Sequence, residues 1–224
     1  SADRRERENA LRHTLKTLDF AARLQARVVV LHLGAVDIAD YTDRLMELAE
    51  QGQRETPKFE KLCREAVAKR ERCKERHLEW AYEILRQLVE QAGKLGLRLG
   101  IENREAVEEV PFEEDFPLLL REFRQPQIGY WHDTGHAQIK ENLGFIRHDI
   151  HLESVADRLL GFHLHDVRFP GGDHLPPGQG SIDFAALKPF ARPEHLKVFE
   201  LSPRVEAGAI PPALEFMKRT WGAE

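Results

Sequence analysis

Cysteine and long hydrophobic runs are scarce in this sequence, and each absence excludes a class of protein. Cys63 and Cys73 are the two cysteines among 224 residues, and their spacing matches no CxxC motif. We therefore predict neither a disulfide framework nor a thiolate metal site. No apolar run approaches the ~20 residues of a membrane span, and the opening residues lack the apolar stretch of a secretory signal. We expect a cytoplasmic protein without a membrane partner.

The sequence also lacks the common motifs of nucleotide binding and nucleophilic catalysis. It contains neither a P-loop nor a GxGxxG fingerprint, and no Ser-His-Asp or Cys-His signature is recognisable. The formal net charge of -5 gives no general attraction to phosphate backbones, so nucleic acid is disfavoured as a partner. The composition, 42% hydrophobic and 32% charged, is typical of a soluble globular protein and leaves open whether the chain forms a homo-oligomer.

Amphipathic helices and short apolar strands are predicted to alternate along the chain. The expected helices cover residues 5–25, 57–95, 116–123, a segment that begins near 183, and 211–220. The expected strands cover residues 27–32, 97–101, 127–131, 160–164 and 196–199. The first strand is expected to be buried, and Ile210, Leu214 and Met217 are expected to face the core. Because parallel strands need a crossover connection, this alternation predicts an α/β fold with a parallel sheet.

The length suits one large domain, and we treat residues 1–224 as a single barrel-like unit. An α/β barrel commonly takes ~250 residues and eight strands, whereas five strands are clear here. The sequence starts without Met and already inside a helix, so we expect the N-terminal strand–helix units of the barrel to lie outside it. The charged helices at about 38–95 read as an excursion after the first strand. The pattern alone leaves an open sheet and a closed barrel as alternatives.

Four polar side chains stand at the ends of consecutive predicted strands. They are Glu102, Asp133, His163 and Glu200, each about one strand–helix unit from the next. In a parallel barrel the carboxyl ends of the strands meet at one rim, where barrel active sites form. A single acid at a strand end is more often a helix cap or a salt-bridge partner, but four in register are hard to obtain by accident. Three carboxylates and an imidazole predict a divalent metal ion as their neutraliser.

Further histidines surround this set. His136 follows in the run His132-Asp-Thr-Gly-His136, where Gly135 is expected to permit a sharp turn, and it could ligate metal or contact substrate. His132 should point away from Asp133 if the strand alternation persists. The same alternation places His163 and His165 on one side, with one binding metal and the other deeper or in contact with a ligand. His32, at the end of the first strand, is either another rim residue or a core histidine.

The segment 170–180 is rich in glycine and proline and is expected to be a functional loop at the rim. It could close over a substrate, with Asp173 and His174 as contacts. Gly178 and Gly180 could let backbone amides approach an anion. A merely structural turn is the alternative.

These motifs resemble the xylose isomerase-like barrel superfamily, which contains sugar isomerases, sugar epimerases and the endonuclease-four type of apurinic-site nuclease (AP endonuclease family 2). The resemblance covers residues 27–220 and rests on five motifs: Ile101-Glu-Asn103, Asp133-Thr-Gly-His136, His163-Leu-His-Asp166, Pro177-Gly-Gln-Gly-Ser-Ile-Asp183 and Phe199-Glu200. It implies a (β/α)8 TIM barrel. It also implies a metal set of Glu102, Asp133, His163 and Glu200, with His136 as a substrate or second-metal residue.

The resemblance further implies a reaction. One Mn²⁺, Mg²⁺ or Co²⁺ ion, with Zn²⁺ as an alternative, would hold the oxygens of a sugar-like small molecule, while Glu102 and Glu200 exchange a proton through an enediolate. Glu108 lies at the offset of a second glutamate of the epimerases, and Arg168 loosely matches their substrate arginine, but the surrounding motifs differ. The expected activity is a metal-dependent isomerase or epimerase. Alternatives are a zinc phosphodiesterase on abasic DNA, for which Gly172 replaces an expected aspartate, and a non-catalytic binding barrel.

Overall fold

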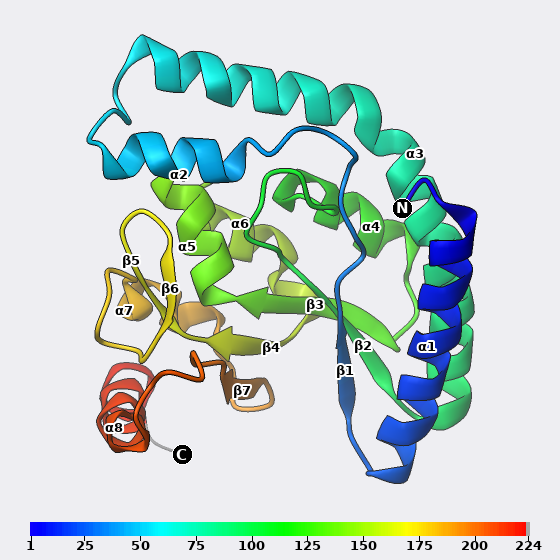
Figure 1. Ribbon diagram of the computed structural model, residues 1–224. Helices are drawn as coiled ribbons and strands as arrows, with labels where there is room; N and C mark the ends of the chain where they lie inside the picture. Colours follow the sequence, from blue (N-terminus) through cyan, green and yellow to red (C-terminus); the bar gives the residue numbers. More distant parts are fainter. Residues whose placement is uncertain (223–224) are drawn as a thin grey trace.

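The structure, a computed structural model, describes residues 1–222 and is built around a curled five-stranded sheet (Figure 1). Its strands, in their order across the sheet, are β1 (Val28–Leu31), β2 (Arg98–Glu102), β3 (Ile128–Asp133), β4 (Leu159–Leu164) and β7 (Leu196–Phe199). Every neighbouring pair is parallel. The sheet is part of a (β/α) barrel, which confirms the predicted fold class.

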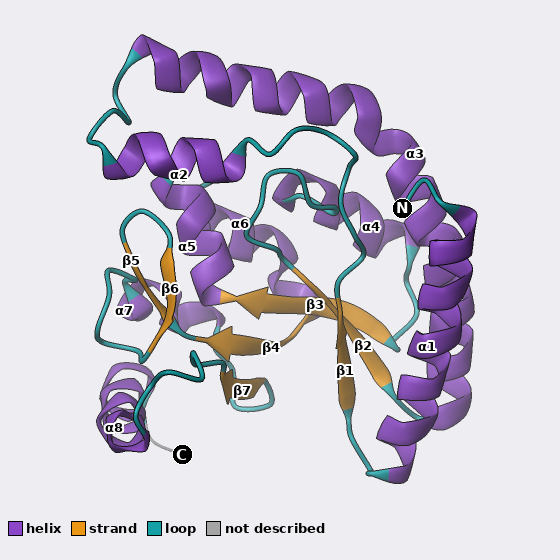
Figure 2. Ribbon diagram, in the orientation of Figure 1, coloured by secondary structure: helices purple, strands orange, loops and turns teal. Residues whose placement is uncertain are grey.

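Helices lie around the outside of this sheet (Figure 2). They are α1 (Arg4–Arg23), α2 (Thr42–Glu50), α3 (Pro57–Leu95), α4 (Phe116–Glu122), α5 (Thr134–Asn142), α6 (His148–Val155), α7 (Phe184–Leu187) and α8 (Ile210–Trp221). Outward side chains of the strands, such as Leu99, Ile128 and Phe162, pack against the helices and form the core. Among residues 1–222, no helix combines the length and apolar character needed to cross a membrane.

The predicted charged excursion contains α2 and the long helix α3. Thr56 caps the start of α3 by accepting a hydrogen bond from the Phe59 N–H, and Gly96 ends it with a left-handed φ of 70°. Its apolar stripe is buried at Ala81, Leu85, Leu88 and Ala92. The second half of α3 runs beside α1 (Figure 1), so the two helices cover one flank of the sheet.

Two burial predictions were wrong. All four residues of β1 are only half-buried, because β1 is an edge strand with a single neighbour. In α8, Ile210 and Leu214 are 43% and 44% exposed, whereas Ala213 and Met217 are buried. The helix packs beside α7, and this contact selects the face that carries Ala213 and Met217.

Four elements were not predicted. Helix α5 follows β3 directly and α6 comes after it, while β5 (Asp166–Arg168) pairs antiparallel with β6 (Gly172–Leu175). The segment expected to be a loop at the rim is therefore partly a β-hairpin. This hairpin stands beside α5 at the carboxyl ends of the strands (Figure 1), where it reaches the candidate site.

Candidate metal centre

The carboxyl ends of β2, β3, β4 and β7 bring the four strand-end residues together. In the sheet, Glu102 is in register with Trp131, and Asp133 is in register with His163. Glu200 follows β7 directly. Ligand atoms of Glu102, Asp133, His163 and Glu200 all lie within 4.8 Å of one another. The convergence expected from the strand pattern is present, whereas metal binding itself stays a prediction.

His163 is the hub of this group. Its Nδ1 lies 2.5 Å from Glu102 Oε1, 2.9 Å from Glu200 Oε2 and 3.8 Å from Asp133 Oδ2. Burial disfavours the charged imidazole, but hydrogen bonds to Glu102 and Glu200 outweigh it and raise the pKa of His163 to about 10. The carboxylates therefore hold a positive charge at the position where a cation would sit.

Glu102 is almost completely buried, with a side-chain exposure of 1%. Its second oxygen, Oε2, lies 2.5 Å from Nε2 of the half-exposed His32. Burial raises the pKa of Glu102, yet hydrogen bonds from His163 and His32 overcome it and lower this pKa to about 2. The structure thus places His32 at the rim of the site rather than in the core.

Arg104 is a site residue that sequence reasoning missed. Its Nη1 lies 3.2 Å from His32 Nε2 and 3.8 Å from Glu102 Oε2, while its Nε bonds Glu109 at 3.0 Å. Its position in the sequence could have indicated this role, because a residue two positions after Glu102 lies on the same side of an extended chain. Arg104 adds a fixed positive charge beside the buried carboxylate of Glu102.

Both the backbone and the side chain of Asp133 are fixed by hydrogen bonds. Asn103 clasps its backbone, since the Asn103 Oδ1 accepts from the Asp133 N–H at 2.7 Å and the Nδ2 donates to its carbonyl at 3.0 Å. The Asp133 Oδ1 caps helix α5 by accepting the His136 N–H at 2.8 Å. Burial opposes the charge, but His136 and His165 lower the pKa of Asp133 well below its usual range. The side chain is an ionised and rigid ligand candidate.

His136 lies beside the four-residue group rather than in it. Its Nδ1 donates to the Asn103 carbonyl at 3.1 Å, which leaves Nε2 as the acceptor nitrogen. The expected sharp turn at Gly135 was wrong, because Gly135 belongs to helix α5. A Cβ at Gly135 would instead overlap the His165 ring, so this glycine is needed for a close approach.

His174 and Asp173, from β6, are the contacts expected from the hairpin segment. A ligand atom of His174 lies within 4.8 Å of those of His136 and His165. Asp173 forms a second group with Glu105 and His136, and its Oδ2 bonds the His174 Nδ1 at 2.8 Å. The hairpin therefore brings polar side chains to the edge of the candidate metal centre.

The glycine amides of the segment do approach an anion, but it is an internal one. The carboxylate of Asp166, which is 1% exposed, accepts hydrogen bonds from the N–H groups of Gly178 and Gly180, both at 2.9 Å. The Ile182 N–H bonds it at 3.0 Å. At Gly180 a Cβ would collide with this carboxylate. The expectation that these amides serve a bound anion is therefore corrected, because Asp166 already occupies them.

Two predicted substrate contacts are not brought to the group. Both oxygens of Glu108 are engaged by the start of α2, where Oε1 accepts the Tyr41 N–H at 2.6 Å and Oε2 accepts the Thr42 hydroxyl at 2.7 Å. Arg168 is exposed on β5. The offset of Glu108 from Glu102 in the sequence was misleading, because the fold directs the Glu108 carboxylate to the start of α2.

The donor set fits a divalent cation. Three carboxylates and one imidazole converge, and oxygen-rich sets of this kind suit Mg²⁺, Mn²⁺ or Co²⁺, with Zn²⁺ compatible through the histidine. Against the effect of burial, hydrogen bonds to Glu102 and Glu200 raise the pKa of His163, and hydrogen bonds from His163 and His32 lower that of Glu102. The carboxylates leave an excess of negative charge at the rim. A divalent ion would neutralise this excess.

The comparisons with known proteins agree with this fold. The family model of the xylose isomerase-like TIM barrel matches residues 1–218. The uncharacterized protein y4fM of Sinorhizobium fredii is 29% identical over 184 residues, which make up 81% of this chain and 48% of that protein. The chain thus spans about half the length of this curated relative.

Solved structures are similar at lower identity. A D-tagatose 3-epimerase-like protein superposes with a TM-score of 0.66 at 20% identity, over 98% of this chain and 71% of that one. A D-psicose 3-epimerase, in the presence of D-fructose, gives 0.64 at 13%, over 100% and 74%. The IOLI protein with a bound zinc atom gives 0.63 at 15%, over 98% and 71%. At these identities the likeness shows the fold.

Proposed function

Because the chain belongs to the xylose isomerase-like TIM barrel family, we propose that it is a divalent-metal-dependent isomerase or epimerase acting on a sugar or a related polyol or keto compound. The observation that carries the proposal is the convergence of Glu102, Asp133, His163 and Glu200 within 4.8 Å at the carboxyl ends of four parallel strands. The naming of structurally similar proteins as sugar epimerases supports the choice of substrate class.

The four side chains would hold one Mn²⁺, Mg²⁺, Co²⁺ or Zn²⁺ ion, which would polarise neighbouring oxygens of an open-chain substrate. Glu102 and Glu200 are the proton-transfer groups of this proposal, and the pKa of each lies below its usual range, so both are ionised bases at neutral pH. Their surroundings differ, since Glu102 is 1% exposed and Glu200 is 43% exposed. One base would act from the interior of the barrel and the other from the open rim.

Substrate contacts are assigned to side chains at the rim. His32 is half-exposed and bonds Glu102, His136 has its Nε2 free of partners in the described residues, and His174 is half-buried beside it. A proton taken from a substrate carbon by one glutamate and returned by the other, through an enediolate of the substrate, would invert that carbon or move the carbonyl group.

Two measurements test this function. Metal analysis of the purified protein should find about one divalent ion per chain, and Glu200→Gln should abolish exchange of a carbon-bound substrate proton with deuterated solvent. Glu206→Gln, at an exposed glutamate, is the matched control and should exchange normally. A metal-loaded protein that exchanges no proton on any of a panel of ketoses, inositols and keto acids would refute the proposal. Three zinc ions with cleavage of abasic DNA would select the nuclease instead.

A further inference from the structure

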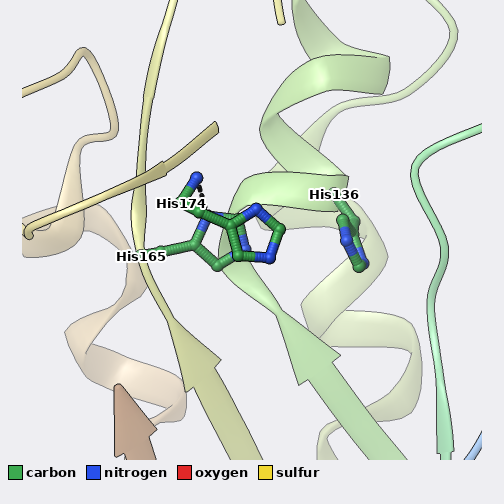
Figure 3. A group of neighbouring side chains, drawn as sticks. All are labelled: His136, His165 and His174. Atoms are coloured by element: carbon green, nitrogen blue, oxygen red, sulfur yellow. Dashed lines mark hydrogen bonds between the residues drawn. The ribbon is translucent and has the colours of Figure 1, made fainter. Parts of the chain in front are cut away.

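Three histidines beside the metal group have the proximity of a second metal site. Ligand atoms of His136, His165 and His174 lie within 4.8 Å of one another. Figure 3 shows the rings of His165 and His174 lying over each other, while His136 stands apart on its helix. Whether the group can bind an ion depends on which ring nitrogens have a free lone pair.

Both nitrogens of His165 are already engaged. The backbone N–H of His174 points at its Nδ1 over 2.9 Å, the dashed line in Figure 3. A backbone N–H can only donate, so this Nδ1 is an acceptor and the proton of the ring is on Nε2. That Nε2 faces the Asp133 carboxylate, 2.9 Å from Oδ1 and 3.1 Å from Oδ2. One tautomer satisfies every contact.

The ring of His165 is also clamped in place. It is fully buried, with 0% exposure. The ring lies against Gly135, where no side chain fits, and is stacked on the His174 ring at a centroid distance of 4.2 Å and an angle of 13°. The Thr134 hydroxyl donates to the His165 carbonyl at 2.8 Å. The ring therefore cannot turn to offer a lone pair to an ion.

We propose that His165 is a positioning residue and is not itself a metal ligand. Its ring connects strand β6 to Asp133, so the position of β6 fixes the orientation of the Asp133 carboxylate, which is a ligand in the proposed metal centre. This rests on the proposed metal function of Asp133. The His165 Nε2–H bonds the Asp133 Oδ2 at 3.1 Å and lies 2.9 Å from Oδ1, which accepts the His136 N–H at 2.8 Å. These two contacts fix the orientation of the carboxylate, and its Oδ2 lies 3.8 Å from the His163 Nδ1 within the proposed metal group.

The link to the hairpin runs through a specific backbone conformation. His174 has a φ of 54°, in the left-handed region that non-glycine residues rarely adopt. This conformation accompanies an N–H directed at His165 and a ring stacked over it. If the hairpin moved from this position, the His165 ring would lose both the hydrogen bond from the His174 N–H and its stacking on the His174 ring. Asp133 would then lose its fixed orientation.

Two substitutions at His165 separate its two hydrogen bonds, the one to the His174 N–H and the one to Asp133. The amide of glutamine can reach where Nε2 stands and donate to Asp133, whereas the shorter asparagine can replace only Nδ1 and accept from His174. We expect His165→Asn to weaken Co²⁺ binding by about 10–100-fold, the usual effect of losing an outer partner of a ligand. His165→Gln should stay within a few-fold of the unsubstituted protein. The readout is Co²⁺ titration followed by its visible absorption.

The outcomes are distinguishable. Equal weakening in both variants, or in neither, overturns the positioning role, and two cobalt ions falling to one in both variants would make His165 a ligand. If the unsubstituted protein binds no cobalt, the proposed function fails instead. Nitrogen-15 NMR of the unsubstituted, metal-free protein then tests the inference independently of binding and of variant folding. It should show His165 protonated on Nε2 alone, and a proton on Nδ1 would contradict the assignment.

Discussion

Two consecutive residues of β3, His132 and Asp133, belong to two different side-chain clusters on opposite faces of the sheet. Asp133 faces the inside of the curled sheet and joins the candidate metal centre. His132 faces outward, as the alternation predicted, and its Nδ1 lies 2.8 Å from the Tyr130 hydroxyl. The network continues from His132 Nε2 to His148 Nε2 at 2.7 Å, and from the Tyr130 hydroxyl to His151 Nε2 at 2.7 Å. Both clusters are built on histidine, yet they differ in charge.

The histidines of the two clusters have pKa values shifted in opposite directions. Inside, hydrogen bonds to carboxylates overcome burial and raise the pKa of His163 to about 10. Outside, burial lowers the pKa of His148 to about 4, although Asp133 and Asp149 oppose it and Lys140 reinforces it. Burial and neighbouring histidines place the pKa of His132 well below its usual range. The carboxylates, rather than the histidines, therefore define the site.

The hydrogen bond between His132 and His148 requires that one of the two Nε2 atoms carries no proton. A neutral imidazole has one donor and one acceptor nitrogen, so His132 and His148 share one proton between their Nε2 atoms. The Tyr130 hydroxyl lies between the His132 Nδ1 and the His151 Nε2, so it donates to one of these nitrogens and accepts from the other. Protonating both rings would remove the acceptor and place two like charges 2.7 Å apart. This cluster stabilises the packing of α6 on β3 as long as it stays uncharged.

The largest expected effect separates the clusters by chemistry. Glu102→Gln removes the charge that His163 and His32 both contact, so we expect substrate proton exchange to fall by roughly 10²–10⁴-fold, together with weaker metal binding. The measurements are deuterium incorporation and Co²⁺ titration. Glu114→Gln, at an exposed glutamate, should change neither. If Tyr130→Phe in the outer network weakens metal binding as much as Glu102→Gln, the two clusters are not independent.

A second prediction uses pH, because the two clusters should give opposite slopes of stability. Unfolded histidine titrates near 6.5. His148 has a lowered folded pKa, so the unfolded chain binds the extra proton, and stability is lost as pH falls from about 6.5 toward 4, by about 3 kcal/mol at most. His163 has a raised folded pKa. Its contribution is complete below about 6.5 and is lost as pH rises toward 10.

Urea unfolding of the metal-free protein across this range measures both limbs. Adding a divalent ion should flatten the alkaline limb, because the ion replaces the proton of His163. His148→Gln should make the acid limb shallower and leave the alkaline limb unchanged, and the remaining acid limb belongs to groups such as His132, whose pKa is also lowered. An alkaline limb that does not respond to metal would contradict the assignment of His163 as a ligand.

The inner cluster was predictable because its information is local. Each of Glu102, Asp133 and Glu200 stands at the end of an apolar strand, and strand parity together with parallel pairing brings such positions to one rim. The outward direction of His132 followed from the same parity. The alternation of elements was likewise sufficient for the fold class, because each strand and its crossover are encoded in one stretch of chain.

The rest depended on contacts that no local pattern encodes. His148, the partner of the His132 Nε2, lies on α6, a helix that was not predicted. Three of the backbone amides that bond Asp166 lie 12 to 16 residues further along the chain. His165 shows the same limit. Its parity with His163 was right, but its role depends on a backbone N–H that the hairpin directs at one ring nitrogen.

The smallest expected effect concerns Glu108, which sequence offset placed in the site and the fold places under α2. Its carboxylate accepts the N–H groups of Tyr41 and Thr42 and the Thr42 hydroxyl, and helix α2 has no side-chain cap of its own. Glu108→Gln should therefore lower the free energy of unfolding by about 1 kcal/mol, as loss of a helix cap does. Metal affinity and kcat/KM should stay unchanged. Glu47→Gln, at an exposed position of α2, is the control for urea unfolding. A fall in kcat/KM at unchanged stability would return Glu108 to the substrate, and would mean that the inner cluster extends to the start of α2.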